Sequence, residues 1–392
     1  MYSLESESID NSRVFLRKAT SSFNVWHRYK LLWVILQFYG IDVYDKDTHR
    51  NLFYKCFQAM TNIFIHLYPV YRIPVSVAHY LDNHLHFATL IGLVFASIFP
   101  LAIKHSINLK KCLLRKIFIQ YHKMDALQNQ KIKGKYFNWV IIITVLISFV
   151  LASASALTLS YDIDQKLSFS FYKDLGEGFV GYFVPFIMNH LVFAYQYEFP
   201  CLVASLSGMM YYEFSRFLLQ LRENLELQRR SLDRNQLMSL HQTHTLLFYL
   251  VHKLLNATSL PCLFILCSQM TSMYCALALF VVYHKDYYPL PTITDWFMSL
   301  ILGTASLSGL IMCASKINTE FNRIQKTALF LKDELMKEQV QDAVALDCVN
   351  ALMEKQFPVM TASGFVDLTP DSLLGMIGSL FTYTLLILNL KQ

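Results

Sequence analysis

Apolar residues gather along the chain into seven long runs, separated by segments rich in polar and charged residues. Each run has 18 to 25 residues, and a helix needs about 20 to cross a hydrocarbon core of about 30 Å at 1.5 Å per residue. The pattern therefore predicts an all-α membrane protein with seven transmembrane helices. The predicted spans are residues 53–77, 85–103, 137–159, 179–202, 260–282, 296–314 and 373–390.

An eighth apolar run, "LLWVILQFYGI" at residues 31–41, is too short to cross. We expect it to form an amphipathic helix at the inner membrane interface, ahead of the first span. No cleavable signal peptide is recognisable before it, so the first span is expected to direct insertion.

Charge orients the predicted spans. The second-to-third connection, residues 104–135, carries nine Lys or Arg, whereas the third-to-fourth connection, residues 161–177, has two Lys against four acids. Because basic loops stay in the cytoplasm, this predicts an intracellular N-terminus and, after seven crossings, an extracellular C-terminus. A G-protein-coupled receptor has the opposite orientation.

Composition agrees with a membrane protein. Of the 392 residues, 54% are hydrophobic and 16% are charged, against about 25% charged in soluble domains. The net charge of +6 follows from the basic loops, so we expect membrane lipid and no nucleic acid as a partner. No phosphate-binding loop or kinase motif occurs, which indicates that the protein is not an enzyme and uses no cofactor.

Two helices are predicted to continue past their spans into the cytoplasm, because apolar residues keep recurring at steps of three and four. A third is predicted at residues 235–259, before the fifth span. Such stripes must be buried, either against each other within one subunit or also between subunits. The two stripes are Phe214, Phe217, Leu218, Leu221 and Leu225, and Phe321, Ile324, Ala328, Leu331 and Leu335.

The last helix has a clear start. Thr369 is a suitable N-cap, Pro370 suits the first helical position, and Asp371 complements the positive helix end. Residues 370–390 form a helix of about 31 Å at 1.5 Å per residue, enough for one crossing. Gly375 and Gly378 would allow a neighbouring helix to approach closely.

This last segment resembles the arthropod gustatory receptors of the insect chemoreceptor superfamily. Their last helix carries Thr-Tyr, five apolar residues, then Gln and an aromatic or aliphatic residue; here Thr382 and Tyr383 are followed by an apolar run that Thr384 interrupts, and then by Asn389 in place of Gln and Leu390. The approach "SGF" followed by "SLLGMIGSLFTY" is also similar. The motif covers about the last 30 residues, and the length and predicted topology agree over the whole chain.

The resemblance implies a gustatory-type chemoreceptor in the plasma membrane, acting as a tetrameric, ligand-gated, non-selective cation channel. Its partners would be a small-molecule tastant, permeant cations and related subunits in a homo- or hetero-tetramer. It implies four parts: a cytoplasmic N-terminal segment with an interfacial helix (1–52), a six-span ligand-binding bundle (53–314), a cytoplasmic helical anchor (315–369) and a pore-lining seventh helix (370–392).

The expected pore and gate residues are Leu386, Asn389 and Leu390, which share a helix face at i, i+3 and i+4. Four copies would place a ring of leucines beside a ring of amides, the first able to gate by dewetting and the second able to coordinate a cation. The alternative is that this face contacts lipid or the bundle.

Ligand candidates are polar or aromatic residues in the outer or middle parts of the spans, since such residues are functional candidates by default. The alternative for each is an interhelical hydrogen bond. The candidates are Ser153, Ser155, Tyr182, Asn189, His190, Gln269, Thr271, Tyr274 and Trp296.

Metal binding is not expected. His79, His84 and His86 cluster in one outer loop, but apart from Asp82 no Cys or carboxylate completes a tetrahedral set. Two other functions compete with the channel: a secondary transporter, although no internal repeat is found, and a seven-span receptor that acts through a soluble partner.

Overall fold

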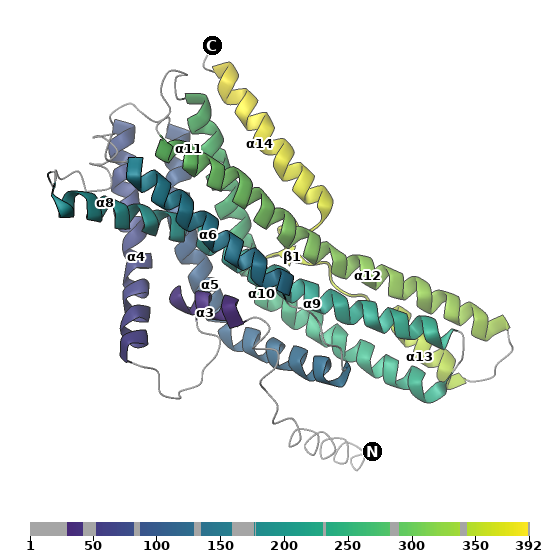
Figure 1. Ribbon diagram of the computed structural model, residues 1–392. Coiled ribbons are helices and arrows are strands. Elements are labelled where there is room, and N and C mark those ends of the chain that lie inside the picture. Colours follow the sequence, from purple (N-terminus) through teal and green to yellow (C-terminus); the bar gives the residue numbers. More distant parts are fainter. Residues whose placement is uncertain are drawn as a thin grey trace.

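The computed structural model describes residues 30–41, 52–81, 87–128, 135–158, 176, 178–229, 233–282, 290–337 and 343–390. Side chains at the start and end of several helices, including those of residues 387–390, lie outside this description. The described chain is almost entirely helical (Figure 1), which confirms the all-α prediction.

The first half of the chain contributes a short helix followed by long membrane-type helices. The short α3 ends where Gly40 adopts φ +76° and Ile41 N–H donates to the Leu36 carbonyl at 3.0 Å, a common helix stop. The elements in this half are α3 (Lys30–Phe38), α4 (Leu52–Leu81), α5 (Phe87–Gln128), α6 (Lys135–Thr158), α8 (Phe179–Val192) and the π-helix η2 (Phe193–Glu198).

The second half contains the longest described helix, α10, and the only described strands. In Figure 1, α9, α10, α12 and α13 lie together at one end, whereas α14 diverges from them. The elements are α9 (Phe199–Gln228), α10 (Arg234–Val282), α11 (Leu290–Phe297), the π-helix η3 (Met298–Gly303), α12 (Thr304–Lys337), α13 (Ala343–Glu354), β1 (Thr361–Ala362), β2 (Val366–Asp367) and α14 (Pro370–Leu390).

Four described helices are long and apolar enough to cross a membrane. They contain most of the second, third, fifth and sixth predicted spans, and lie at Phe87–Met124, Phe137–Leu157, Arg234–Phe280 and Met298–Lys337. The remaining three spans and the orientation stay predictions.

The helices that were expected to leave the membrane do continue. Within the 49 residues of α10, about 74 Å at 1.5 Å per residue, lie both the predicted fifth span and the predicted third extension. Every residue of the two apolar stripes on α9 and α12 is buried, because these helices pack along each other. We call this end of the molecule the anchor bundle; it consists of α13 and of residues 203–228, 234–259 and 315–337 from α9, α10 and α12.

Two segments have structure that the sequence patterns did not reveal. The basic connection after the second span is mostly helical, because α5 continues through it to Gln128. The anchor segment 315–369 is not wholly helical: β1 and β2 form a hairpin whose turn places Ser363 and Gly364 at φ 52° and 74°. Strands of two residues are too short for hydrophobic periodicity to reveal.

The short α3 is confirmed as a helix and is not peripheral to the chain. Leu32 and Leu36 are fully buried, and the Trp33 ring packs edge-on against Phe118 of α5 with centroids 4.9 Å apart. The opposite face exposes Val34 and Phe38. Its position at the membrane interface stays a prediction.

Candidate ligand-binding site

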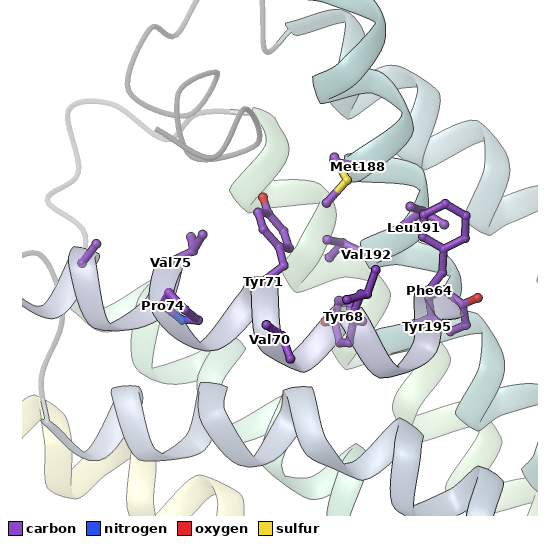
Figure 2. A pocket seen from close by; sticks show the side chains of 12 residues that line it. Phe64, Tyr68, Val70, Tyr71, Pro74, Val75, Met188, Leu191, Val192 and Tyr195 are labelled. Carbon is purple, nitrogen blue, oxygen red and sulfur yellow. The ribbon is translucent and has the colours of Figure 1, made fainter. Parts of the chain in front are cut away.

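A cavity of about 550 Å³ lies between α4, α8 and η2, within the range of about 300–1,000 Å³ typical of ligand pockets. Figure 2 shows the side chains of its 12 lining residues, none of which carries a charge. They are Phe64, Leu67, Tyr68, Val70, Tyr71, Pro74, Val75, Ala78, Met188, Leu191, Val192 and Tyr195.

One face of α4 forms most of the wall. Phe64, Tyr68, Tyr71 and Val75 recur at steps of three and four residues, which places them above one another on the helix. The Tyr71 ring projects from α4 toward the side of the cavity where Met188 lies (Figure 2). Pro74 has no N–H, so the carbonyl of Val70 loses its helical partner beside the cavity.

The opposite wall comes from α8 and the π-helix that follows it. A π-helical turn inserts one residue into a helix and is frequent at functional sites. Here it places Tyr195 and Gln196 on the side that faces α4: the Tyr68 hydroxyl donates to Gln196 Oε1 at 2.7 Å, and the Tyr195 hydroxyl donates to the Thr61 carbonyl at 3.1 Å. These bonds fix the two phenols at the edge of an otherwise apolar volume.

The chemistry of this lining favours a neutral, largely apolar small molecule. Aliphatic and aromatic groups cover the wall, so an ionised ligand would lose its hydration without a counter-charge. Because both phenols already donate to protein groups, their oxygens are left to accept a hydrogen bond, which suits a ligand with one hydroxyl group.

The sequence-predicted ligand residues do not line this cavity. Four of them instead join α6 to α8. Asn189 Nδ2 donates to the Ala152 carbonyl at 2.8 Å, and Ser155 Oγ lies 3.4 Å from Asn189 Oδ1. His190 Nδ1 lies 2.8 Å from the Phe186 carbonyl, which can only accept, so Nε2 is left to accept from Ser153 Oγ at 3.2 Å.

Three of the other candidates lie on α10. Gln269 of α10 is buried, and its Nε2 donates to Cys201 Sγ at 3.5 Å. Its Oε1 lies 2.8 Å from where a Cβ on Gly303 would be, so a larger residue at position 303 would displace the end of the Gln269 side chain. Thr271 and Tyr274 lie against Gly92 of α5.

Two aromatic candidates contact neighbouring helices. The Tyr274 ring meets the Tyr383 ring of α14 edge-on at 6.2 Å, and the Trp296 ring meets Phe280 at 5.1 Å. Tyr182 is 51% exposed. The structure thus spreads the candidates over several helix contacts, and a ligand contact by any of them stays a prediction.

The pocket tyrosines Tyr68, Tyr71 and Tyr195 were not predicted as ligand residues, because other polar and aromatic groups of the spans were chosen. The available signal was an aromatic stripe, Phe64, Tyr68 and Tyr71, interrupted by Pro69 and Pro74. A stripe of this kind more often indicates helix packing, so it was not conclusive.

The last helix begins and ends as predicted, at Pro370 and Leu390. Thr369 caps it, since Thr369 Oγ1 accepts from Ser372 N–H at 3.4 Å. Its main contacts are with α10 and α12, and a Cβ on Gly375 or Gly378 would meet nothing within 4 Å. No described helix of this chain therefore occupies the surface that the glycines leave open.

The predicted pore residues lie toward the end of this helix. Leu386 is 52% exposed, while the side chains of Asn389 and Leu390 lie outside the described residues. In the family motif, Thr382 Oγ1 donates to the Gly378 carbonyl at 2.9 Å. The loop histidines His84 and His86 also lie outside the described residues, among which no group of three metal-binding side chains is found.

No family model matches the chain, and no curated protein sequence matches it either. Solved structures do match it, among them two of one receptor. One is the insect olfactory receptor OR5 from Machilis hrabei in complex with eugenol, with a TM-score of 0.68 and 11% identity over 92% of this chain and 97% of that one. The other is a second structure of the same receptor, with a TM-score of 0.59 and 13% identity over 96% of this chain and 99% of that one. The chain therefore has the fold of an insect olfactory receptor over nearly its whole length.

Proposed function

We propose that this protein is a chemoreceptor of the insect chemoreceptor superfamily and works as a ligand-gated cation channel. The observation that carries the proposal is the likeness to an olfactory receptor across 92% of the chain. The Thr382-Tyr383 motif near the end of the last helix supports the same superfamily and favours its gustatory branch.

The ligand is a small neutral molecule held in the cavity of α4, α8 and η2. The uncharged lining and the two fixed phenols support this assignment. The structure of the similar olfactory receptor in complex with eugenol, a small molecule, also supports it. Binding opens the channel only if the open state holds the ligand more tightly than the closed state.

The channel is a tetramer in the plasma membrane, with seven spans in each subunit and the N-terminus inside. The α14 helices of four subunits line the pore, with Leu386 and Leu390 as the constriction and Asn389 as the cation-coordinating ring. The exposed apolar surface of α14 supports this assembly, because Leu374, Phe381, Leu385 and Leu386 are each more than half exposed in one chain.

Whole-cell recording from cells that express the full chain tests the proposal. A panel of neutral tastants and aromatic alcohols should evoke cation currents. Asn389→Ala should change the permeability ratio between sodium and calcium, because a ring of amides coordinates partly dehydrated cations. The matched control is Asn322→Ala, at an exposed position of α12.

The cavity is tested separately. Ala78→Phe places a ring in the cavity and should raise the half-maximal ligand concentration at least tenfold without changing single-channel conductance. Val77→Phe is its control, since Val77 is the preceding residue and does not line the cavity. Surface-expressed protein that gives no current with any ligand would contradict the channel. An unchanged dose response in Ala78→Phe would contradict the pocket alone.

A further inference from the structure

A second cavity, of about 500 Å³, lies between α6, α9 and the helix formed by η3 and α12. It shares no lining residue with the candidate ligand site. Its walls are mostly apolar or small side chains, and it is open along the side of the molecule at Ala305 and Gly309, which are exposed.

The cavity has the length of one membrane leaflet. Its walls run from Cys201 to Glu213 on α9 and from Leu302 of η3 to Cys313 of α12. Twelve and eleven helical steps span about 18 and 17 Å at 1.5 Å per residue, slightly more than half of a hydrocarbon core of about 30 Å. A groove of this length accommodates the acyl chain of a single lipid.

The one charged side chain that lines the groove, Glu213, lies at the end formed by Tyr212 and Cys313. The Glu213 carboxylate is paired with Arg216 at 3.0 Å. Lys316 is exposed, and its Nζ lies 5.3 Å from the centroid of the Tyr212 ring, which lines the cavity. Lys316 makes no ion pair within the described part of the chain, so this end of the groove carries a net positive charge.

We propose that this groove binds a phospholipid with an anionic headgroup, with one acyl chain between α6, α9 and α12 and the phosphate at Lys316. Basic pockets between transmembrane helices on the cytoplasmic side bind anionic headgroups. In the orientation proposed above, Lys316 faces the cytoplasm, and the cytoplasmic leaflet is the anionic one. The lipid would join α6 to α9 and α12, two helices that continue into the anchor bundle.

Thermal unfolding of the purified full chain in detergent tests this, with phosphatidylglycerol added in one series and phosphatidylcholine in another. Phosphatidylglycerol should raise the apparent Tm more, since only its headgroup carries a net negative charge. Lys316→Gln should abolish this difference. Lys326→Gln is the matched control, because Lys326 is an exposed lysine of the same helix.

The apolar part of the groove is tested with Gly309→Leu. A Cβ at Gly309 meets nothing within 4 Å, so the larger side chain enters the groove without displacing the protein. It should reduce the rise in Tm caused by phosphatidylglycerol at least threefold, whereas Gly309→Ala should retain it. Native mass spectrometry should show fewer retained phosphatidylglycerol molecules on the Leu variant only.

Equal stabilisation by both lipids would overturn the proposal, and so would a preference for phosphatidylglycerol that survives Lys316→Gln. A change of oligomeric mass in Gly309→Leu would also overturn it, because the groove would then bind a neighbouring subunit. If Gly309→Leu fails to fold, Lys316→Gln decides alone, since an exposed lysine is not needed for folding. No result depends on channel current, so failure of the proposed function would be seen separately.

Discussion

The anchor bundle and α14 both carry apolar faces in the sequence, but only the bundle buries its face within one chain. Every residue of the α9 and α12 stripes is buried. On α14, Leu374, Phe381 and Leu385 are 60% exposed or more. Lipid or another subunit can cover such an apolar surface without exposing it to water. The apolar faces of the bundle are already covered within one chain.

Phe357 packs against rings from three helices of the bundle. It lies after α13 and is stacked on Phe321 of α12 at 4.5 Å, with planes 7° apart, and on His244 of α10 at 5.2 Å. Phe248 and Phe214 complete the cluster. Phe357 thus contacts three long helices, whereas the aromatic contact described for α14 is a single pair, Tyr383 with Tyr274. The difference indicates that stability is concentrated in the bundle and that α14 is held less firmly.

The largest effect is expected for Phe357→Ala. Removing a buried ring leaves a cavity between three helices, at a cost of about 3–5 kcal/mol. Thermal unfolding of the detergent-solubilised protein measures it. Phe365→Ala is the control, because Phe365 belongs to the nearby hairpin turn and is 81% exposed. Equal losses in the two variants would mean that the packing of Phe357 does not stabilise the bundle.

A pH dependence should follow from His244, which is fully buried in the part of α10 that precedes the predicted fifth span. Burial, with the nearby Lys355 and His241 adding to it, lowers the pKa of His244 from 6.5 to about 4. Neither of its ring nitrogens has a hydrogen-bond partner in the described residues. The native state therefore keeps this ring neutral.

Because the unfolded chain binds a proton at a higher pH than the native one, stability is constant above about pH 6.5 and falls between pH 6.5 and 4. The loss is on the order of 3 kcal/mol. Unfolding measured across this range should show it, and His244→Phe should remove most of it. His252→Phe, at an exposed position of the same helix, should leave it in place. An unchanged slope in His244→Phe would exclude His244 as its source.

A smaller effect separates the inside of the bundle from its surface. Glu320 of α12 is 3% exposed and accepts from both Arg222 and Arg323 at 2.8 Å. Its neutralisation in Glu320→Gln removes the shorter and more buried of the two ion pairs of Arg222, which keeps only the 3.4 Å pair with the exposed Glu226. The change should cost about 2–3 kcal/mol. Glu334→Gln breaks the 2.6 Å pair with Arg229 at a site that is 35–47% exposed, where about 0–1 kcal/mol is typical.

Similar destabilisation in Glu320→Gln and Glu334→Gln would show that burial does not set the strength of these pairs. Thermal unfolding of both variants in the same detergent makes the comparison direct. A loss of stability in Glu334→Gln alone would mean that the more important ion pair lies at the C-terminal ends of α9 and α12.

Local signals in the sequence were enough for α14 and for the helices of the bundle. Thr369 and Pro370 mark the start of α14 in the sequence itself, and a periodic stripe identifies the buried face of α9 or α12 without knowledge of its partner. Charge did not fix helix ends in the same way: the basic residues after the second span continue α5, since Lys and Arg are good helix formers.

The candidate pocket could not be predicted from the sequence, because it depends on contacts between distant segments. The Tyr68 hydroxyl meets Gln196, 128 residues further along the chain. The π-helical turn that directs Tyr195 toward α4 leaves no recognisable pattern in the sequence. Polar residues that were selected as ligand groups, such as Asn189 and His190, form bonds between α6 and α8.

The smallest effect on stability is expected on α14, in Phe381→Ser combined with Leu385→Ser. Both residues lie one turn apart on the exposed face, so the solubilised single chain should lose no more than about 0.5 kcal/mol, as at other surface positions. If four copies of this face enclose the pore, the same pair of changes should abolish the closed state and leave a ligand-independent cation leak. Thermal unfolding and whole-cell recording of one variant therefore measure the two properties independently. A fall in stability close to that of Phe357→Ala would mean that α14 is packed as firmly as the bundle, and the contrast between the two regions would not hold.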